Sequence, residues 1–340
     1  MNEKTYRIAV LGAGSWGMAL AMVLEGNGHT VDLWEFRPEA AEKLHRTRDA
    51  GEFLPGIVLP EAISVTNHFD AACVGKDIIV VAVPSHVVRE VSKRLDRLSG
   101  LGHTVLVNVA KGVENESLLR MSRVILENVS WAEEEKVVTL SGPSHAEEVS
   151  RKIPTAIVSA CPNLQTAEFV QSVFMNRYFR VYTNQDIVGV ELGGALKNII
   201  AIAAGICDGA GFGDNTKAAL QPRGLVEIVR LGVAMGANQE TFAGLSGMGD
   251  LIVTCMSKHS RNRYVGEQIG KGRKLDDILK EMVMVAEGVK TTRSAYELSK
   301  KYNVEMPITN QTYQVLFQNK NARDALNELM TRGPKEERFG

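Results

Sequence analysis

A short glycine pattern near the N-terminus constrains the fold of this chain more than any other feature. Gly12, Gly14 and Gly17 stand in the segment GAGSWG, directly after the apolar run Arg7–Leu11 and before a helical pattern. Glycines with this spacing allow a tight turn, a close backbone approach to a pyrophosphate, and close packing of the helix on the strand. The helix expected to start near Ser15 would offer free N–H groups to that anion.

The sequence around the glycines decides how the pattern is interpreted. The motif alone is weak, because an incidental glycine-rich turn has the same composition. Here it lies between the run Arg7–Leu11 and a second strand pattern over Thr30–Glu35, which ends in an acidic residue. An acid at that place normally accepts hydrogen bonds from the ribose of NAD. The context therefore favours a dinucleotide site over an incidental turn.

The first half of the chain alternates strand patterns with helix patterns. The run DIIVVAV is continuous and β-branched, which is typical of a strand buried on both faces. The further strand candidates are Ile63–Asn67, Asp77–Val83, Thr104–Val109, Lys136–Leu140, Thr155–Ala160 and Phe179–Tyr182. The intervening helix candidates are Trp16–Glu25, His86–Leu95 and Glu116–Glu127. This alternation predicts an α/β domain with a doubly wound parallel sheet.

Beyond Asp186 helix patterns dominate, so we expect residues 1–186 to form the α/β domain and residues 187–340 an all-helical domain. The apolar run Leu251–Thr254 is the one strand-like exception, and a polar C-terminal tail is expected to be loose. The expected helices are Val188–Cys207, Thr216–Met235, Arg261–Lys271, Leu275–Glu281, Thr291–Lys300 and Asn310–Leu329.

Lys197 stands in the middle of the first of these helices, which is otherwise nearly all apolar or small. Glu191 is the other charged residue in this run, and two charges within about 20 residues argue against a membrane span. A buried ammonium loses hydration, which lowers its pKa and suits it to general acid/base work. The alternative is a lysine whose ammonium reaches water along the helix surface.

Several other polar residues are candidates for binding, and each has a simpler alternative. Lys111 follows the fifth strand pattern and would otherwise be a solvated lysine. Ser144, with Glu147 three residues later, forms a capping-box pattern that predicts a helix start and an anion site. Asp250 could orient Lys197 or a substrate hydroxyl, or simply cap a helix, and Arg261 with Asn262 suits a phosphate or a solvated face.

Composition narrows the class of protein. Hydrophobic residues make up 44% and charged residues 23% of 340 residues, as in an ordinary globular protein. The net charge of -1 gives no reason to expect nucleic acid or an anionic membrane as partner. The four cysteines lack metal-site or disulfide spacing, and the N-terminus lacks a signal-peptide pattern, so we expect a cytoplasmic protein without a bound metal.

Taken together, these segments resemble the soluble, nicotinamide-dependent glycerol-3-phosphate dehydrogenases. The matching stretches occur in family order over both predicted domains: GAGSWG (12–17), VAKGVE (109–114), LSGPSHAEEV (140–149), GGALKN (193–198), GDNTKAAL (213–220), GMGDLIVTC (247–255), HSRN (259–262) and EGV (287–289). Each could occur elsewhere, but the ordered set is highly specific.

The resemblance implies a Rossmann-type domain followed by a helical domain, and reversible hydride transfer between NAD(P)H and dihydroxyacetone phosphate that gives sn-glycerol 3-phosphate for lipid synthesis. It implies Lys197 as proton donor and acceptor, and a homodimer. The implied substrate-binding residues are Lys111, Gly142, Ser144, Lys197, Asp250, Ser260, Arg261 and Asn262. The implied cofactor-binding residues are Gly12, Gly14, Ser15, Trp16, Gly17, Phe36, Arg37, Lys111, Ala146, Arg261, Val285 and Glu287.

Two departures from the family pattern stand out. Glu35 and Phe36 occupy positions where similar members often carry a small residue and a histidine, which leaves the choice between NADH and NADPH open. Gln221 and Pro222 also differ, with a helix bend as the expected consequence. The competing functions are a hydroxy-acid dehydrogenase of the 6-phosphogluconate or 3-hydroxyisobutyrate type, and a non-catalytic nucleotide sensor that would leave the buried Lys197 unexplained.

Overall fold

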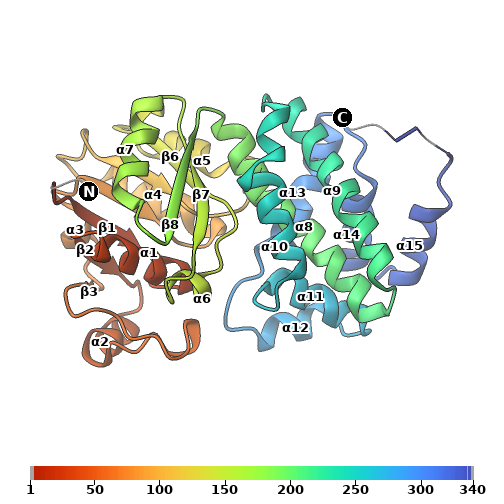
Figure 1. Ribbon diagram of the computed structural model, residues 1–340, viewed down its shortest axis with the longest axis horizontal. Helices are drawn as coiled ribbons and strands as arrows, with labels where there is room; N and C mark the ends of the chain where they lie inside the picture. Colours follow the sequence, from red (N-terminus) through yellow and green to blue (C-terminus); the bar gives the residue numbers. More distant parts are fainter. Residues whose placement is uncertain (1–3, 335, 338–340) are drawn as a thin grey trace. The chain divides into compact units, whose positions relative to one another are not determined.

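The computed structural model describes residues 4–334 and 336–337, so the expected loose tail lies partly outside the described residues. Contacts divide the chain into two compact units (Figure 1). The sheet unit comprises residues 1–110 and 121–187, and the helical unit comprises residues 111–120 and 188–340. The sequence predicts a single boundary after Asp186. The contacts instead place the ten-residue loop Lys111–Arg120 in the second unit.

The sheet unit is built on eight strands in the order β3-β2-β1-β4-β5-β6-β7-β8. All pairs are parallel except β6 and β7, which run antiparallel and depart from the expected all-parallel sheet. The strands are β1 (Arg7–Leu11), β2 (Thr30–Trp34), β3 (Ser64–Thr66), β4 (Ile78–Val81), β5 (Val105–Asn108), β6 (Val137–Ser141), β7 (Thr155–Ala160) and β8 (Phe179–Asn184). Strands β4 and β5 are buried along their whole length, as their continuous apolar sequences predict.

The order of the strands reverses between β1 and β4, which pair in register with Val10 opposite Val80. Open α/β sheets bind ligands at such a switch point, beyond the carboxyl ends of the strands. The helices of this unit are α1 (Ser15–Gly26), α2 (Pro38–Thr47), α3 (Phe69–Cys73), α4 (Val88–Asp96), α5 (Met121–Asn128), α6 (Ala146–Val149) and α7 (Leu164–Phe174).

The helical unit contains α8 (Ile187–Ala210), α9 (Asp214–Ala234), α10 (Asp250–Met256), α11 (Arg261–Gly270), α12 (Leu275–Glu281), α13 (Glu287–Lys301), α14 (Pro307–Phe317) and α15 (Ala322–Met330), whose labels follow Figure 1. Helix α8 is its centre. Among the described residues, it alone is long and apolar enough to cross a membrane. However, 94% of its apolar window is buried inside the protein, which is the pattern of a core helix.

Small residues let neighbouring segments approach α8 closely. A Cβ built on Gly193 would lie 2.6 Å from the carbonyl oxygen of Ser246, and one on Gly205 would lie 2.0 Å from that of Arg263. Both distances are shorter than real contacts, so only glycine fits there. These two glycines thus bring α11 and the turn before α10 directly against α8.

Three local predictions differ from the structure. Leu251–Thr254 is helical, because it forms part of α10. The expected helix over 310–329 is two helices, α14 and α15, separated at a turn where Asn319 has φ 56°. The expected helix over 116–127 begins only at Met121, since the preceding residues belong to the loop of the helical unit. Helix α9 continues through Pro222.

Candidate active site

The glycine loop of the sheet unit connects β1 to α1. Gly12 has φ 115°, and a Cβ there would lie 2.7 Å from the carbonyl oxygen of Ala82, which follows β4. A Cβ on Gly17 would lie 1.9 Å from the carbonyl oxygen of Gly12. Around Gly14, by contrast, an added Cβ would meet nothing within 4 Å. Two glycines therefore close the turn, and the third leaves open space at the start of α1 where a pyrophosphate fits.

The residues beside this loop also suit a nucleotide. Ser15 is buried at the first position of α1, and the indole Nε1 of Trp16 is buried without a hydrogen-bond partner in the protein. A buried donor of this kind is unusual and fits a site completed by a ligand or water. Ala146 is buried in the core of the same unit, at the start of the short helix α6.

At the end of β2, Glu35 and Arg37 form an ion pair. The Nε of Arg37 donates to Oε1 of Glu35 at 2.7 Å, and the backbone N–H of Arg37 donates to the same oxygen at 3.2 Å. The side chain of Glu35 is 8% exposed, whereas that of Arg37 is 50% exposed. Phe36 is largely exposed, with its ring 5.6 Å from the Arg37 guanidinium. Part of the Arg37 charge is thus already balanced within the protein.

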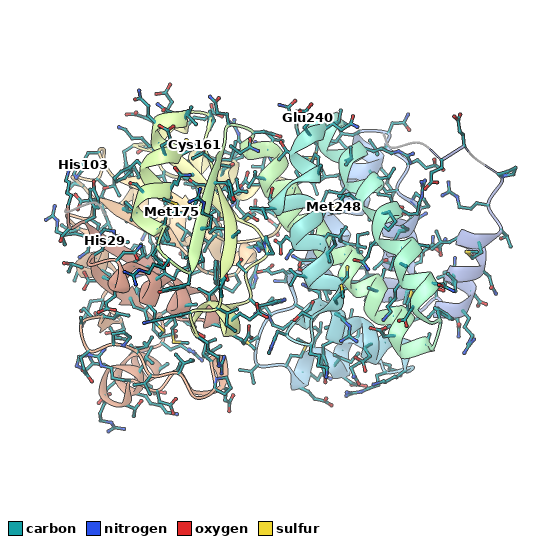
Figure 2. All side chains as sticks on the ribbon, in the orientation of Figure 1. His29, His103, Cys161, Met175, Glu240 and Met248 are labelled. Atoms are coloured by element: carbon teal, nitrogen blue, oxygen red, sulfur yellow. The ribbon has the colours of Figure 1, made fainter. Side chains whose placement is uncertain are left out.

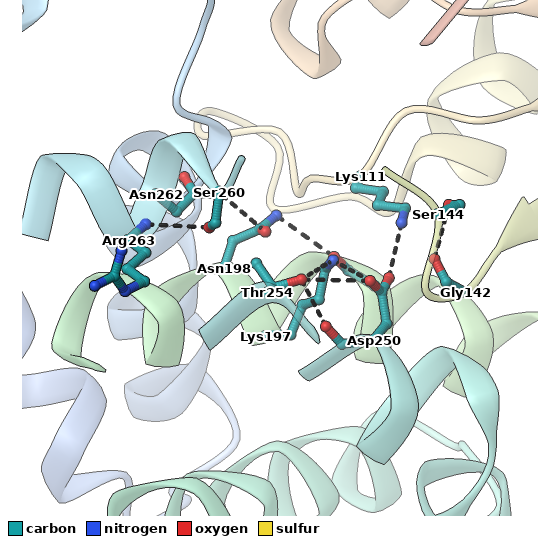
Figure 3. Close-up of polar contacts among 11 residues, drawn as sticks. Lys111, Gly142, Ser144, Lys197, Asn198, Asp250, Thr254, Ser260, Asn262 and Arg263 are labelled. Carbon is teal, nitrogen blue, oxygen red and sulfur yellow. Dashed lines mark hydrogen bonds and ion pairs between the residues drawn. The ribbon is translucent and has the colours of Figure 1, made fainter. Parts of the chain in front are cut away.

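In the helical unit, two lysines converge on one carboxylate (Figure 3). Lys197 donates to Oδ1 of Asp250 and, at 2.6 Å, to the hydroxyl of Thr254. Lys111 donates to Oδ2 of Asp250 at 2.7 Å. The Thr254 hydroxyl in turn donates to the backbone carbonyl of Asp250 at 2.6 Å. Lys197 and Asp250 are buried, and the side chain of Lys111 is 19% exposed.

The protonation of this cluster follows from its burial and charge. Burial lowers the pKa of Lys197; Asp250 opposes this shift and Lys111 adds to it, so the pKa falls from 10.5 to about 7. Burial raises the pKa of Asp250, but the two ammonium groups more than offset that effect and the pKa is lowered. One carboxylate between two ammonium groups leaves an excess positive charge, which favours proton loss from the more buried lysine.

The backbone around Asp250 explains how the carboxylate reaches α8. Residues Leu245–Gly249 form a π-helical turn that leads into α10. A Cβ on Gly247 in this turn would lie 2.1 Å from the carbonyl oxygen of Phe242, so the turn requires glycine there. The glycine-rich sequence before Asp250 therefore serves to place that residue against α8. Asp250 is the first residue of α10, but Gly249 holds the N-cap position and the Asp250 carboxylate binds the two lysines, so the alternative that Asp250 caps a helix is wrong.

Three residues at the start of α11 differ in burial and in their contacts. The hydroxyl of Ser260 accepts from the backbone N–H of Arg263 at 3.2 Å and caps the helix. Asn262 is buried; its amide donates to Asn198 at 2.9 Å, and its carbonyl oxygen accepts from the N–H of Gly288 at 2.9 Å. Asn262 thus joins α8, α11 and α13. Arg261 is exposed at the first position of α11.

The structure changes the interpretation of Ser144. The capping-box pattern predicts that Ser144 caps a helix, but α6 begins at Ala146, spans four residues and has His145 at its N-cap. The hydroxyl of Ser144 instead donates to the carbonyl of Gly142 at 2.9 Å. A helix thus begins close to Ser144, as the pattern predicts, but it begins later than expected and has no side-chain cap, so Ser144 itself does not cap it. Gly142 has φ 147°, and a Cβ there would lie 2.9 Å from the Cα of Ile157.

The remaining predicted cofactor residues lie at the start of α13. Glu287 is its first residue, and Val285 is 38% exposed in the segment before it. Both belong to the helical unit. Their role toward the cofactor stays a prediction.

No three His, Cys, Asp or Glu side chains are grouped to hold a metal ion in the part of the chain that the structure describes. Figure 2 draws the side chains of the described residues and labels His29 and His103 in the sheet unit. All four cysteines are buried and free.

Two site residues were not identified from the sequence. Thr254 contacts Lys197 directly, and its position four residues after Asp250 places it on the same face of α10. Asn198 follows Lys197 and anchors Asn262. The i, i+4 spacing from Asp250 was an available signal for Thr254, whereas no local pattern marks Asn198.

Comparison with known proteins agrees with this geometry. Residues 7–167 match the model for the N-terminus of NAD-dependent glycerol-3-phosphate dehydrogenase, and residues 186–327 match the model for its C-terminus. A glycerol-3-phosphate dehydrogenase (NAD(P)+) of Prosthecochloris aestuarii is 55% identical over 97% of this chain and 99% of its own length. The enzyme of the same name from Geobacillus thermodenitrificans is 54% identical over 97% of this chain and 96% of its own.

A solved structure shows the same fold over the whole chain. The crystal structure of glycerol-3-phosphate dehydrogenase from Coxiella burnetii has a TM-score of 0.91 and 36% identity, and covers 96% of this chain and 99% of that one. D-mandelate dehydrogenase is also similar in fold, with a TM-score of 0.53, but is only 10% identical. The chain therefore belongs to the family of NAD-dependent glycerol-3-phosphate dehydrogenases.

Proposed function

We propose that this chain catalyses the reversible reduction of dihydroxyacetone phosphate to sn-glycerol 3-phosphate with NAD(P)H, and that Lys197 is the proton donor and acceptor. Family membership supports the reaction class and the cofactor. The single observation that carries the role of Lys197 is its buried cluster with Asp250, Lys111 and Thr254.

The cofactor supplies the hydride, and the protein supplies the proton. Hydride addition to a ketone places negative charge on the carbonyl oxygen, which a protonated Lys197 can stabilise and then neutralise. An ammonium has three N–H groups. Lys197 directs two of them to Asp250 and Thr254, so the third is the one that can donate to the substrate oxygen.

Asp250 and Thr254 orient this lysine. Thr254 donates its hydroxyl hydrogen to the backbone carbonyl of Asp250, so its oxygen acts as an acceptor toward Lys197. Both contacts hold the flexible lysine side chain in one direction. In the oxidation direction Lys197 must be neutral to accept the alcohol proton, and a pKa of about 7 makes both forms accessible near neutral pH.

The substrate phosphate requires cationic or N–H donors. We assign it to Arg261, whose guanidinium fork suits a phosphate, together with Lys111 and Ser260. Asn262 is assigned an indirect part, because its amide already contacts Asn198 and Gly288. The predictions that Gly142 and Ser144 lie near the substrate, and that Val285, Glu287 and Ala146 meet the cofactor, remain part of the proposal.

For the cofactor, the glycine loop, Ser15 and Trp16 are assigned to the pyrophosphate side, and Phe36 and Arg37 to the adenosine side. The Glu35–Arg37 pair supports use of both NADH and NADPH. Glu35 retains a carboxylate oxygen for a ribose hydroxyl, while the exposed part of Arg37 can approach a 2′-phosphate. A homodimer and a cytoplasmic location complete the proposal; the four buried, free cysteines suit a reducing compartment.

The proposal is tested by absorbance at the NADH band with the purified chain. Consumption of NADH or NADPH should depend on dihydroxyacetone phosphate, and unphosphorylated dihydroxyacetone should be a poor substrate. Turnover of 6-phosphogluconate or 3-hydroxyisobutyrate instead would support a hydroxy-acid dehydrogenase. Nucleotide binding without any turnover would support a nucleotide sensor.

A further inference from the structure

The loop Lys111–Arg120 lies in sequence between β5 and α5, yet packs within the helical unit. Its first residue, Lys111, is part of the charge cluster on Asp250. Its last residue, Arg120, forms an ion pair with Glu191 of α8, and the two side chains are only 12% and 4% exposed. Glu191 is the second charged residue of the apolar run, and the proposed chemistry does not use it.

Both ends of the loop therefore form ion pairs close to the segment 191–197 of α8. Glu191 precedes Lys197 by six residues, a rise of about 9 Å along the helix. At one end Lys111 reaches the carboxylate that holds Lys197, and at the other end Arg120 reaches Glu191.

The middle of the loop is also held. Val113 is buried in the core of the helical unit, and its backbone carbonyl accepts from the hydroxyl of Ser294 in α13 at 3.1 Å. Ser294 contacts the side chain of Asn115 as well, at 2.7 Å. A β-bridge between Val113 and Arg120 joins the two arms of the loop. A displacement of Arg120 would therefore be transmitted to the arm that carries Lys111.

We propose that Glu191 is a positioning residue that, by holding Arg120, fixes the loop so that the Lys111 ammonium stays on Asp250 beside Lys197. The lysine stem is flexible, so the place of its ammonium depends on where the loop holds its backbone. The charged and titratable groups that face Lys197 are Asp250, Lys111 and the thiol of Cys255. The loop supplies the only one of the three that comes from outside α10.

The proposal predicts a specific electrostatic signature. Lys111 lowers the pKa of Lys197, so release of the loop should raise that pKa. In glycerol 3-phosphate oxidation, the midpoint of the kcat–pH profile should move upward from about 7. A rise of about one pH unit would reduce kcat at pH 7 about fivefold, because a smaller fraction of Lys197 is neutral.

The first experiment compares Glu191→Gln with Glu227→Gln in the full chain. Glu227 is a matched control, since it is a buried carboxylate of the same unit that accepts from the N–H groups of Ile308 and Thr309 at the start of α14. Glu191→Gln should shift the kcat midpoint and leave the KM for the nucleotide unchanged. Glu227→Gln should lower the melting temperature and leave the midpoint in place.

A second variant guards against failure of Glu191→Gln to fold. Ser294→Ala removes only the hydroxyl that holds the middle of the loop and should give a smaller shift in the same direction. Arg120→Lys should retain part of the contact with Glu191, so its kcat midpoint should lie closer to that of the unmodified protein than the midpoint of Glu191→Gln does. An unshifted midpoint in both Glu191→Gln and Ser294→Ala, or an equal shift in Glu227→Gln, would overturn the proposal.

The inference rests on the proposed role of Lys197, and the two can fail separately. If Lys197→Met retains near-normal kcat, the proposed role of Lys197 is wrong. If Lys197→Met abolishes turnover but the kcat midpoint does not respond to Glu191→Gln or Ser294→Ala, only the positioning role is wrong.

Discussion

The glycine loop of the sheet unit and the charge cluster of the helical unit are built in opposite ways. The loop lies within six consecutive residues, and its geometry comes from the absence of side chains at Gly12 and Gly17. The cluster combines Lys111, Lys197 and Asp250, which are far apart in sequence and act through their charges. The loop therefore acts through its backbone, and the cluster acts through its side chains.

This difference predicts two kinds of sensitivity. The loop should respond to added volume and be indifferent to pH, because its N–H groups do not titrate. The cluster should tolerate a side chain of similar volume but respond strongly to loss of charge, because burial makes each charge costly unless it is paired.

The largest effect is expected for Lys197→Met. Methionine keeps most of the volume in α8 but removes the transferable proton, so kcat should fall by about 10²–10⁴-fold. Fluorescence titration should show unchanged NADH binding, since the glycine loop is untouched. Lys271→Met, at an exposed lysine of the same unit, serves as the control. Near-normal kcat in the Lys197 variant would remove this residue from the mechanism.

The next effect concerns volume in the loop. Gly17→Ala should weaken NADH binding roughly 100-fold and lower the melting temperature, because the new Cβ meets the backbone of Gly12. Gly14→Ala should weaken NADH binding without that loss of stability, since its Cβ meets open space that the pyrophosphate needs.

The control for these variants is Gly102→Ala, at another glycine of the sheet unit with open space around it. It should leave both NADH binding and the melting temperature unchanged. Equal NADH affinity in Gly14→Ala and the unmodified protein would place the pyrophosphate elsewhere.

A smaller effect is expected in the pH dependence of the unmodified protein. Where Lys197 is mostly in the unproductive protonation state, kcat should change about tenfold per pH unit. The pKa of Lys197 is lowered to about 7, so its neutral form prevails above that pH and its protonated form below. The kcat for oxidation should therefore fall as pH drops below about 7, and the kcat for reduction should fall as pH rises above it. Stopped-flow measurements of both directions check this pattern.

Lys111→Gln sharpens the same test. Loss of the second ammonium should move both midpoints to higher pH, because Lys111 opposes the positive charge on Lys197. Midpoints that stay in place would show that Lys111 does not act on Lys197 through its charge.

The smallest effect is expected at the 2′ position of the nucleotide. Glu35→Ala should release Arg37 from its ion pair and shift the ratio of kcat/KM toward NADPH about tenfold, or roughly 1.4 kcal/mol. Glu39→Ala, at an exposed acid of the neighbouring helix, should leave the ratio unchanged. Dual use would be contradicted by a preference above about a thousandfold in the unmodified protein.

Local patterns predicted most of the fold. All eight strands occur where strand patterns predict them, and the clearest signature comes from β4 and β5, which are buried along their whole length. The predictions that failed depend on contacts with residues outside the local pattern, which a local pattern does not report. Helix α6 begins two residues after Ser144, with His145 at its N-cap, and the run Leu251–Thr254 is helical because it continues the helical turn that places Asp250 against α8.

The site was predictable only in part. Lys197, Asp250 and Lys111 were named from the sequence, each with a solvated or capping alternative, and the structure brings all three together. The attachment of residues 111–120 to the helical unit was missed, because it depends on Arg120 meeting Glu191 about 70 residues later in the chain. Periodicity reports only on neighbours within one element.

The assignment of residues 111–120 to the helical unit also affects how the two units can be exchanged between proteins. These ten residues lie inside the segment that matches the N-terminal family model, yet they pack within the helical unit. A gene fusion that joins residues 188–340 to a different nucleotide-binding domain would leave behind Lys111 and the partner of Glu191. Recombination of the two halves, in the laboratory or in evolution, must therefore carry this short segment across, and a single crossover point cannot do so.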